Sequence, residues 1–285
     1  MLFRSALDHP AATRSDIDYI LDRVNEVLRR PLTDDDIVGV YVGLRPLLAP
    51  PDAASAATTK LSREHQVARA VPGLVAVAGG KYTTYRVMAQ DTVDVALEDL
   101  GPGIPDSVTD RVPLLGAAGL NAVRNRAESI AIRYGVPTTV VTRMIGRYGD
   151  LVEEVLAPIA ADPSLAHPVP GAPAHVRAEI RYAVTHEGAL HLDDILARRT
   201  RISVDTGHRG LESVDAVAAI AAPLLGWSPA QVEGEIEAYR RRVEQERASQ
   251  QALQDEAAQR ARSQAPDSRP GAQRDDRDER SSVAS

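Results

Sequence analysis

Hydrophobic and polar positions divide the sequence into a first part with β-type runs and a longer second part with helical periodicity. The first element is nevertheless a helix, because apolar residues recur at the spacing of one helix face. These residues are Ile17, Ile20, Leu21, Val24 and Leu28. Ser15 precedes them and is the expected N-cap.

Three downstream runs are rich in β-branched residues and predict strands over residues 37–42, 58–67 and 74–78. Pro46 ends the stretch that follows the first run. The third run leads into the adjacent glycines Gly79 and Gly80, and a helix is expected to continue from there to Leu100.

The segment 101–105 is rich in glycine and proline and is expected to be a linker to a helical part. The expected helices there are residues 121–134, 138–147, 150–160, 174–186, 192–199, 213–225 and 228–247. The last has the clearest start, with Ser228 as N-cap, Pro229 at the first helical position and Gln231 as capping-box partner. The pattern therefore predicts an α+β chain with a β-containing part over 1–100 and a helical domain over 105–247.

Residues 248–285 contain almost no large apolar side chain between Leu253 and Val283. Such a segment buries too little surface to offset its chain entropy, so we expect a disordered tail. Composition narrows the class of the whole chain. A hydrophobic content of 44% and a charged content of 26% are typical of a globular protein and exclude collagen-like and membrane classes.

The charge balance and the residue types absent from the chain exclude further kinds of site. The formal net charge of -7 argues against bulk attraction to nucleic acid or an anionic bilayer. With no cysteine, the chain has no disulfide, thiolate metal site or Cys nucleophile. No apolar run reaches the length of a membrane span, and the acidic N-terminal segment does not resemble a signal peptide.

The junction of Gly79, Gly80 and Lys81 between the third strand and its helix is the most informative local feature. Adjacent glycines allow a sharp turn and close approach of a ligand, and the following helix N-terminus favours negative charge. Lys81 adds a cation, and Thr83 and Thr84 add hydroxyl groups. These residues indicate a site for an anion or a polarised carbonyl. An ordinary tight turn with a solvated lysine explains them equally well.

Two arginines of the β-containing part, Arg45 and Arg63, are candidates for phosphate binding, because a guanidinium fork suits phosphate oxygens. The alternative for each is a structural ion pair, with Glu64 or Asp52 as the available partner. Arg45 follows an apolar run, which is an unusual position for a charge that has no partner.

The remaining polar clusters favour structural roles. No pair of the seven histidines has the spacing of a metalloprotease helix. His186 and His191 flank acidic residues, but capping and surface roles are favoured over a metal site. The run from Arg198 to Arg201 has no interleaved aromatic residue, so we expect it to complement a helix C-terminus or pair with Asp193 and Asp194 rather than bind nucleic acid.

Several motifs resemble the FAD-dependent, quinone-linked glycerol-3-phosphate dehydrogenases. In the β-containing part these are residues 39–47, Ser62 to His65, and residues 72–86 with the Gly-Gly-Lys turn. In the helical part, residues 182–190 and 192–201 resemble the signature of that family's C-terminal domain. The resemblance runs in order from about Asp8 to Arg247. It implies that residues 1–100 are part of an FAD-dependent oxidoreductase domain.

The resemblance also implies roles for individual residues. Arg45 and Arg63 would hold the phosphate of glycerol 3-phosphate, and Lys81 would lie near both substrate and flavin. The implied cofactor is FAD, contacted on the pyrimidine side of its ring by Gly79, Gly80, Lys81, Thr83 and Thr84. The implied reaction oxidises sn-glycerol 3-phosphate to dihydroxyacetone phosphate and passes electrons to a quinone. No residue is identified as the catalytic base, and no metal is implied.

One departure from the family separates two hypotheses. Family members carry a Gly-x-Gly-x-x-Gly turn for the ADP half of FAD, and this sequence has none. We therefore expect a C-terminal portion that lacks the N-terminal FAD-binding half, is inactive by itself and leaves sheet edges unpaired. The alternative is a non-catalytic helical interaction or regulatory module derived from such an enzyme.

The partners implied by the resemblance are glycerol 3-phosphate, quinone and the missing N-terminal half, with no nucleic acid. The implied location is the cytoplasm. Peripheral contact with the inner face of the membrane is left open, because no strongly amphipathic basic helix is found. Homodimer formation is left open as well.

Overall fold

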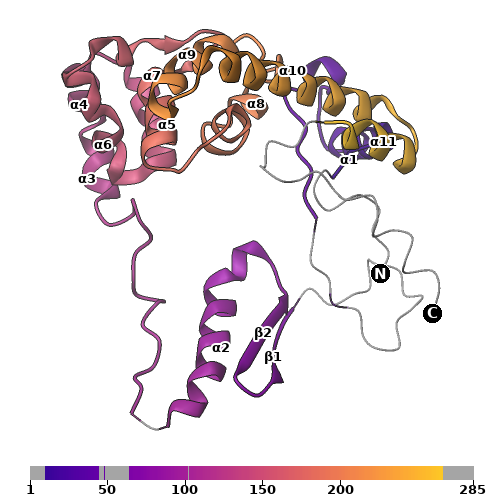
Figure 1. Ribbon diagram of the computed structural model, residues 1–285, viewed down its shortest axis with the longest axis vertical. Coiled ribbons are helices and arrows are strands. Elements are labelled where there is room, and N and C mark those ends of the chain that lie inside the picture. The colour runs from indigo at the N-terminus through magenta and orange to yellow at the C-terminus, as the bar shows by residue number, and fades with distance from the viewer. Residues whose placement is uncertain (1–9, 45–47, 49–63, 102, 266–285) are drawn as a thin grey trace.

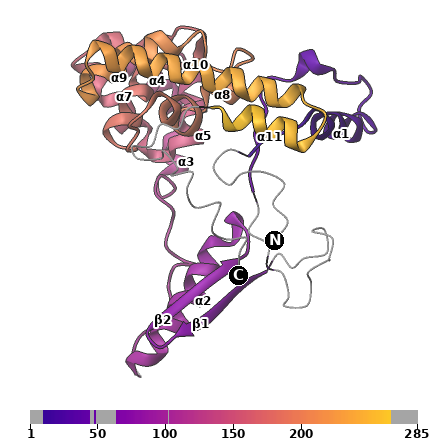
Figure 2. The same ribbon diagram turned by 45° about the vertical axis from the view of Figure 1, so that its right-hand side comes forward.

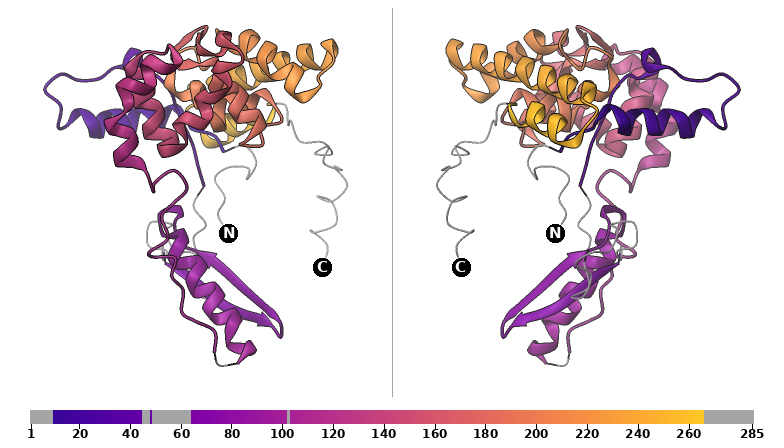
Figure 3. Two further views of the ribbon diagram at one scale, coloured as in Figure 1. Left: turned by 90° about the vertical axis from the view of Figure 1, so that its left-hand side faces the viewer. Right: turned by 90° about the vertical axis from the view of Figure 1, so that its right-hand side faces the viewer.

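The computed structural model describes residues 10–44, 48, 64–101 and 103–265. A helical part forms the upper body in Figure 1, and a two-stranded sheet with one helix lies below it. The two remain apart when the molecule is turned (Figures 2 and 3). This arrangement confirms the predicted α+β class, with a small β-containing part followed by helices.

The elements of the first part are mostly short. They are α1 (Arg14–Asn25), the 3-10 turn η1 (Asp34–Asp36), β1 (His65–Val71), β2 (Leu74–Gly79), the 3-10 turn η3 (Tyr82–Thr84), α2 (Tyr85–Leu97) and η4 (Glu98–Leu100). The predicted strand over 74–78 and the helix after it are confirmed. The predicted strand over 58–67 is described only from residue 64, and β1 begins at His65.

The second part is built from helices and one short hairpin. Its first half contains α3 (Leu120–Asn125), α4 (Ala127–Tyr134), α5 (Thr138–Tyr148), η5 (Gly149–Leu151), α6 (Val152–Leu156), η6 (Ala157–Ala160) and η7 (Pro163–Ala166). The hairpin pairs β3 (Pro168–Val169) with β4 (Ala172–Val176). The second half contains α7 (Arg177–Thr185), the π-helix η8 (Asp194–Arg199), α8 (Ile202–Asp205), α9 (Val214–Leu225), α10 (Pro229–Gln251) and α11 (Asp255–Ser263).

The antiparallel pair β1 and β2 has α2 on one face. His65 lies opposite Gly79 in the ladder, and Gln66 lies opposite Ala78. Side chains alternate between the faces of a sheet, so His65 and Arg69 share a face. Arg69 binds Asp99, beyond the C-terminal end of α2, which shows that this face is the helix side. The opposite face carries Gln66 and small exposed alanines.

The hydrophobic core lies in the helical part. Among the described residues, buried hydrophobic side chains begin at Val123, apart from Ala12 near the N-terminus. One cluster lies between α4, α5 and α6 and includes Ile130, Met144 and Leu156. A second joins α7, the π-helix, α9 and α10. The helical part therefore has the buried apolar surface of a domain, whereas β1, β2 and α2 expose Val71, Leu74 and Val93.

The start of α10 confirms the predicted capping box. The backbone N–H of Gln231 donates to the Ser228 hydroxyl, and the side chain of Gln231 accepts from the Ser228 backbone N–H. Pro229 stands at the first helical position, where its missing N–H costs nothing. The helix continues past the predicted end at residue 247 to Gln251.

The predicted strand over 37–42 is wrong. Residues 37–44 are outside any strand or helix, because a strand needs a ladder partner, and β1 and β2 pair only with each other within the described residues. Gly39 lies against α8 instead: a Cβ built there would be 2.7 Å from the carbonyl oxygen of Val204.

The predicted cap at Ser15 is also wrong. Thr13 is the N-cap of α1, because the Asp16 carboxylate accepts from the Thr13 backbone N–H while the backbone N–H of Asp16 donates to the Thr13 hydroxyl. The Ser15 hydroxyl donates to the carbonyl oxygen of Leu253. The apolar face of α1 is not buried, since Ile20 is 61% exposed.

Other helix boundaries differ locally from the prediction. The segment 121–134 is broken at Arg126, which separates α3 from α4, and Gly135 ends α4 in the left-handed conformation as predicted. Residues 174–176 belong to β4 rather than to the helix that follows. The segment 194–199 is a π-helix, a form with a wider hydrogen-bonded turn that is rare in proteins.

The predicted disordered tail differs most from the structure. Residues 248–251 continue α10, and α11 follows over Asp255–Ser263. Alanine, glutamine and arginine are good helix formers, and Ala258 is fully buried, so α11 obtains tertiary support without large apolar side chains. The rest of the predicted tail, residues 266–285, lies outside the described residues.

Candidate flavin and substrate site

The turn after β2 has the backbone that only glycine adopts freely. Gly79 and Gly80 have φ angles of 79° and 77°, in the left-handed region. A Cβ at Gly79 would lie 2.7 Å from the carbonyl oxygen of Glu64. A Cβ at Gly80 would lie 2.5 Å from Sδ of Met88. Both conformation and space therefore require glycine at this turn.

Lys81 follows in extended conformation, with its side chain exposed to solvent. Its carbonyl oxygen accepts from the backbone N–H and from the hydroxyl of Thr84, each at 3.0 Å. The hydroxyl of Thr84 is thus committed to the turn, while Thr83 makes no side-chain hydrogen bond within the described residues. The turn presents the Lys81 side chain and the Thr83 hydroxyl to solvent just before α2.

Arg45 and Arg63 lie outside the described residues. Glu64 follows Arg63 directly, and Leu48 is three residues after Arg45. Both occupy the space that a side chain at Gly79 would need, since its Cβ would lie 2.9 Å from Cδ1 of Leu48 and 2.7 Å from the oxygen of Glu64. Leu48 and Glu64 therefore both lie against the glycine turn.

Sequence reasoning missed Asp91 as the partner of His65. Nε2 of His65 lies 2.7 Å from Oδ2 of Asp91. The contact joins the first residue of β1 to the middle of α2. A separation of 26 residues gives no local sequence signal for such a pair.

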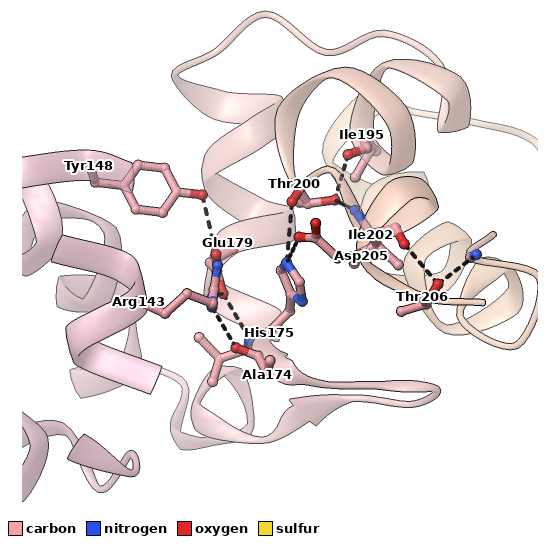
Figure 4. A network of polar contacts seen from close by, with 12 residues as sticks. Arg143, Tyr148, Ala174, His175, Glu179, Ile195, Thr200, Ile202, Asp205 and Thr206 are labelled. Carbon is pink, nitrogen blue, oxygen red and sulfur yellow. Dashed lines mark hydrogen bonds and ion pairs between the residues drawn. The ribbon is translucent and has the colours of Figure 1, made fainter. Parts of the chain in front are cut away.

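The signature segment of the helical part lies around a buried polar network, shown in Figure 4. Glu179 on α7 is fully buried and forms an ion pair with Arg143 on α5. It also caps its own helix, because Oε1 accepts from the backbone N–H of Val176 at 3.0 Å. The network therefore fixes α7 against α5.

His175 belongs to the same network and is 2% exposed. Its Nε2–H donates to the carbonyl oxygen of Thr200 at 3.2 Å, at the end of the π-helix. Burial lowers the pKa of His175 below its ordinary value, partly offset by the nearby Glu179 carboxylate. Nδ1 has no hydrogen-bond partner. His175 is therefore a neutral core residue that joins β4 to the π-helix.

Tyr182 and His186, both in the signature segment, stack on each other with ring centroids 4.5 Å apart. The Tyr182 hydroxyl donates to Glu154 at 3.0 Å, and burial raises the Tyr182 pKa to about 12. Burial also raises the pKa of Glu187. The carbonyl oxygen of Glu187 accepts from Nε of Arg199 at 2.8 Å. These signature residues hold α7 to its neighbours.

The structural interpretation of the histidines and of the basic run is supported. His191 binds Glu235 through Nδ1 at 2.7 Å. Arg198 pairs with Asp193 and Asp194, as the sequence predicts. In the part of the chain that is described, no group of three or more potential ligand side chains could hold a metal ion. No helix among these residues has both the length and the apolar character of a membrane span.

Comparison with known proteins decides the nature of the helical part. Residues 107–232 match the model of the C-terminal domain of alpha-glycerophosphate oxidase. This segment is similar to that domain family. The match begins just after the predicted linker and ends in α10. It contains the first core cluster of the helical part and most of the second.

Relatives extend the similarity to the β-containing part. The chain is 50% identical over 263 residues, 92% of its length, to proteins named glycerol-3-phosphate dehydrogenase 2 of Mycobacterium bovis and Mycobacterium tuberculosis. A protein named glycerol-3-phosphate dehydrogenase from Mycobacterium leprae is equally similar. The chain spans 44% of the length of these relatives and corresponds to their C-terminal portion.

A solved structure is also similar. It is the glycerol-3-phosphate dehydrogenase of Bacillus halodurans complexed with FAD, at a TM-score of 0.64 and 25% identity. The match covers 84% of this chain and 46% of the Bacillus chain. The β-containing part and the C-terminal domain therefore occur together in a known flavoenzyme.

Proposed function

We propose that the chain supplies part of the flavin and substrate site of an FAD-dependent glycerol-3-phosphate dehydrogenase, together with its helical C-terminal domain. The reaction oxidises sn-glycerol 3-phosphate to dihydroxyacetone phosphate and passes the electrons to a quinone. The observation that carries the proposal is the 50% identity over 92% of the chain to mycobacterial glycerol-3-phosphate dehydrogenases. The matched segment includes the turn at Gly79 and Gly80, where both residues have positive φ angles.

The substrate phosphate is assigned to Arg45 and Arg63, because paired N–H groups of a guanidinium match phosphate oxygens. Two contacts with Gly79 support this assignment. Glu64 directly follows Arg63, and Leu48 is three residues after Arg45. Lys81 is exposed beside the same turn and adds positive charge. The substrate would therefore bind next to the flavin.

The residues of the turn fit the pyrimidine side of FAD. Gly79 and Gly80 make a sharp, closely packed turn that leads into Lys81, Thr83 and Thr84. The side chains of Lys81 and Thr83 are exposed there. FAD, when bound, supplies the oxidising group that takes the hydride from C2 of the substrate. The helix N-terminus and Lys81 stabilise negative charge at this edge. The Thr84 hydroxyl holds the turn closed through the Lys81 carbonyl.

The ADP half of FAD needs polypeptide beyond this sequence, because no Gly-x-Gly-x-x-Gly turn occurs in it. The exposed apolar residues of β1, β2 and α2, such as Leu74 at 53% and Val93 at 51%, support such a partner. We propose that a flavin-binding portion like that of the relatives binds the ADP half of FAD and also covers these exposed apolar residues. The assembled enzyme would lie in the cytoplasm, with peripheral contact at the inner face of the membrane where it meets quinone.

A second function, a non-catalytic interaction module, is favoured by one observation. The buried core lies from Val123 onward, so the helical part has the packing to fold without flavin. In that case the β-containing part would be a remnant that retains only a phosphate-binding corner.

Joining the chain to the flavin-binding portion of the Mycobacterium tuberculosis relative tests the proposal. The purified complex of the two portions, or a fusion of them, is expected to reduce a dye when glycerol 3-phosphate is added. It is expected to be inactive with glycerol. The same flavin-binding portion without this chain is the control. A colourless, inactive assembly whose helical part is well folded would instead support the interaction module.

A further inference from the structure

The contact between His65 and Asp91 joins β1 to α2 next to the glycine turn. His65 is the first residue of β1, and Asp91 is the seventh residue of α2. Nε2 of His65 and Oδ2 of Asp91 are 2.7 Å apart, and the histidine side chain is 19% exposed. A short, half-buried contact between a ring N–H and a carboxylate is among the stronger kinds of hydrogen bond.

The contact lies directly beside Gly79 and Gly80. His65 pairs with Gly79 across the ladder. Cβ of His65 would be 3.1 Å from a Cβ at Gly80, and Sδ of Met88 would be 2.5 Å from it. The glycine turn is therefore confined between the start of β1 and the first turns of α2, and the His65–Asp91 contact holds these two elements together.

A second contact fastens the other end of the same unit. Arg69 binds Asp99 at 2.5 Å and the carbonyl oxygen of Val95 at 2.6 Å. Both ties link β1 to α2 or the turn after it, on the same face of the sheet. Only the first adjoins the glycine turn, so Arg69 offers a matched control within one structural unit.

We propose that His65 and Asp91 are a positioning pair for the flavin-contacting turn. They hold residues 79–84 so that the N–H groups at the start of α2 and the Lys81 side chain keep a fixed direction. Neither residue needs to touch substrate, so the role is distinct from catalysis. The inference rests on the proposed function for its link to flavin, but the mechanical role can be measured without flavin.

Hydrogen exchange of the full chain tests the mechanical role. Asp91→Ala is expected to accelerate exchange of the amides of residues 79–84 at least tenfold, which corresponds to about 1.4 kcal/mol. Asp91→Asn keeps an acceptor oxygen and is expected to restore exchange to within about threefold of the unmodified chain. Arg69→Gln should accelerate exchange near residues 95–99 and leave residues 79–84 unchanged.

Two results would overturn the inference: unchanged exchange of residues 79–84 in Asp91→Ala, or equal acceleration there by Arg69→Gln. Protection of the helical part serves as a folding reference in each variant. In an assembly that holds flavin, Asp91→Ala should shift the visible absorption maximum, and Asp91→Asn should restore it. Loss of the turn's protection in an assembly that never takes up flavin would leave the positioning role standing and refute the proposed function.

Discussion

The backbone N–H of Arg14 donates to the carbonyl oxygen of Ala252 at 2.9 Å, which joins the first helix to the turn between α10 and α11. The Ser15 hydroxyl donates to Leu253 next to it. Residues that are 238 positions apart in the sequence therefore share one contact region. The anchoring of α1 depends on the conformation of the α10–α11 turn.

Ala258→Glu is expected to release α11 and loosen α1 with it. Ala258 is fully buried, and a carboxylate at that position would be desolvated without a partner. Hydrogen exchange should accelerate over residues 252–263 and also over residues 13–16, while the amides of α5 and α7 stay protected. The exposed neighbour variant Glu256→Ala is the control and should change neither region. Loosening of α11 alone would refute the coupling.

Glu179→Ala is expected to be among the most destabilising substitutions in the helical part. It removes the cap of α7 and leaves the Arg143 guanidinium without its carboxylate, at a cost of about 3–5 kcal/mol. Denaturant unfolding followed by circular dichroism measures the change. Glu237→Ala on α10 removes an exposed pair with Arg241 and should cost less than about 1 kcal/mol. Similar losses from both variants would contradict the role assigned to Glu179.

The burial of His175 is expected to make the free energy of unfolding decrease at acidic pH. Burial places its folded-state pKa below the ordinary value of 6.5, so the unfolded chain binds more protons as the pH falls below 6.5. This contribution to the free energy of unfolding is complete above pH 6.5 and is lost progressively below it.

Unfolding of the unmodified chain and of His175→Gln at several pH values isolates this component. The difference in free energy between the two proteins should shrink as the pH falls through this range. The groups that face His175 are Glu179, Arg143 and Asp205, and all of them remain in the variant. A difference that does not depend on pH would show that His175 does not titrate on unfolding.

Gly80→Ala is expected to destabilise the unit of β1, β2 and α2 by about 1–3 kcal/mol. A Cβ there meets Met88 at 2.5 Å and forces alanine into a φ of 77°. Gly73→Ala, with a φ of 81° but nothing within 4 Å, is the matched control and should cost only about 1–2 kcal/mol. Backbone hydrogen exchange over residues 65–97 distinguishes the two. A greater effect at Gly73 would contradict the steric argument.

Arg45→Ala, made in an assembly that contains the flavin-binding portion, should weaken substrate binding far more than flavin binding. The reason is that the phosphate, and not the flavin, would lose the guanidinium fork. Titration with glycerol 3-phosphate and measurement of bound flavin give the two affinities. Equal loss of both would refute the phosphate assignment.

The sequence predicts a helix start or a turn correctly where the residues that form it are close together in the chain. Ser228 with Gln231 predicts the start of α10, and the glycine pair predicts the turn after β2. Thr13 and Ser15 are chemically equivalent caps, and only the position of Asp16 favours Thr13. The strand predicted over 37–42 failed because strand formation needs a distant ladder partner, and the partnership of His65 with Asp91 lies across 26 residues.

The tail prediction failed for a related reason. Alanine side chains have little apolar area. Ala258 is nevertheless fully buried, and its small side chain allows α11 to pack closely against α10. A prediction from amino-acid composition considers only how much apolar surface a segment can bury, so it misses helices that are stabilised by close packing of small side chains. The same limit applies to Glu179, because composition does not show that this charged residue is fully buried.

Visible absorption tests the central claim most directly. The chain is expected to be colourless when purified alone and to co-purify with a flavin-binding portion as a yellow complex that glycerol 3-phosphate bleaches. Retention of FAD by the chain alone would contradict the claim that the flavin site is shared with further polypeptide. Failure of the two portions to associate, with each well folded, would contradict the claim that this chain forms part of such an enzyme.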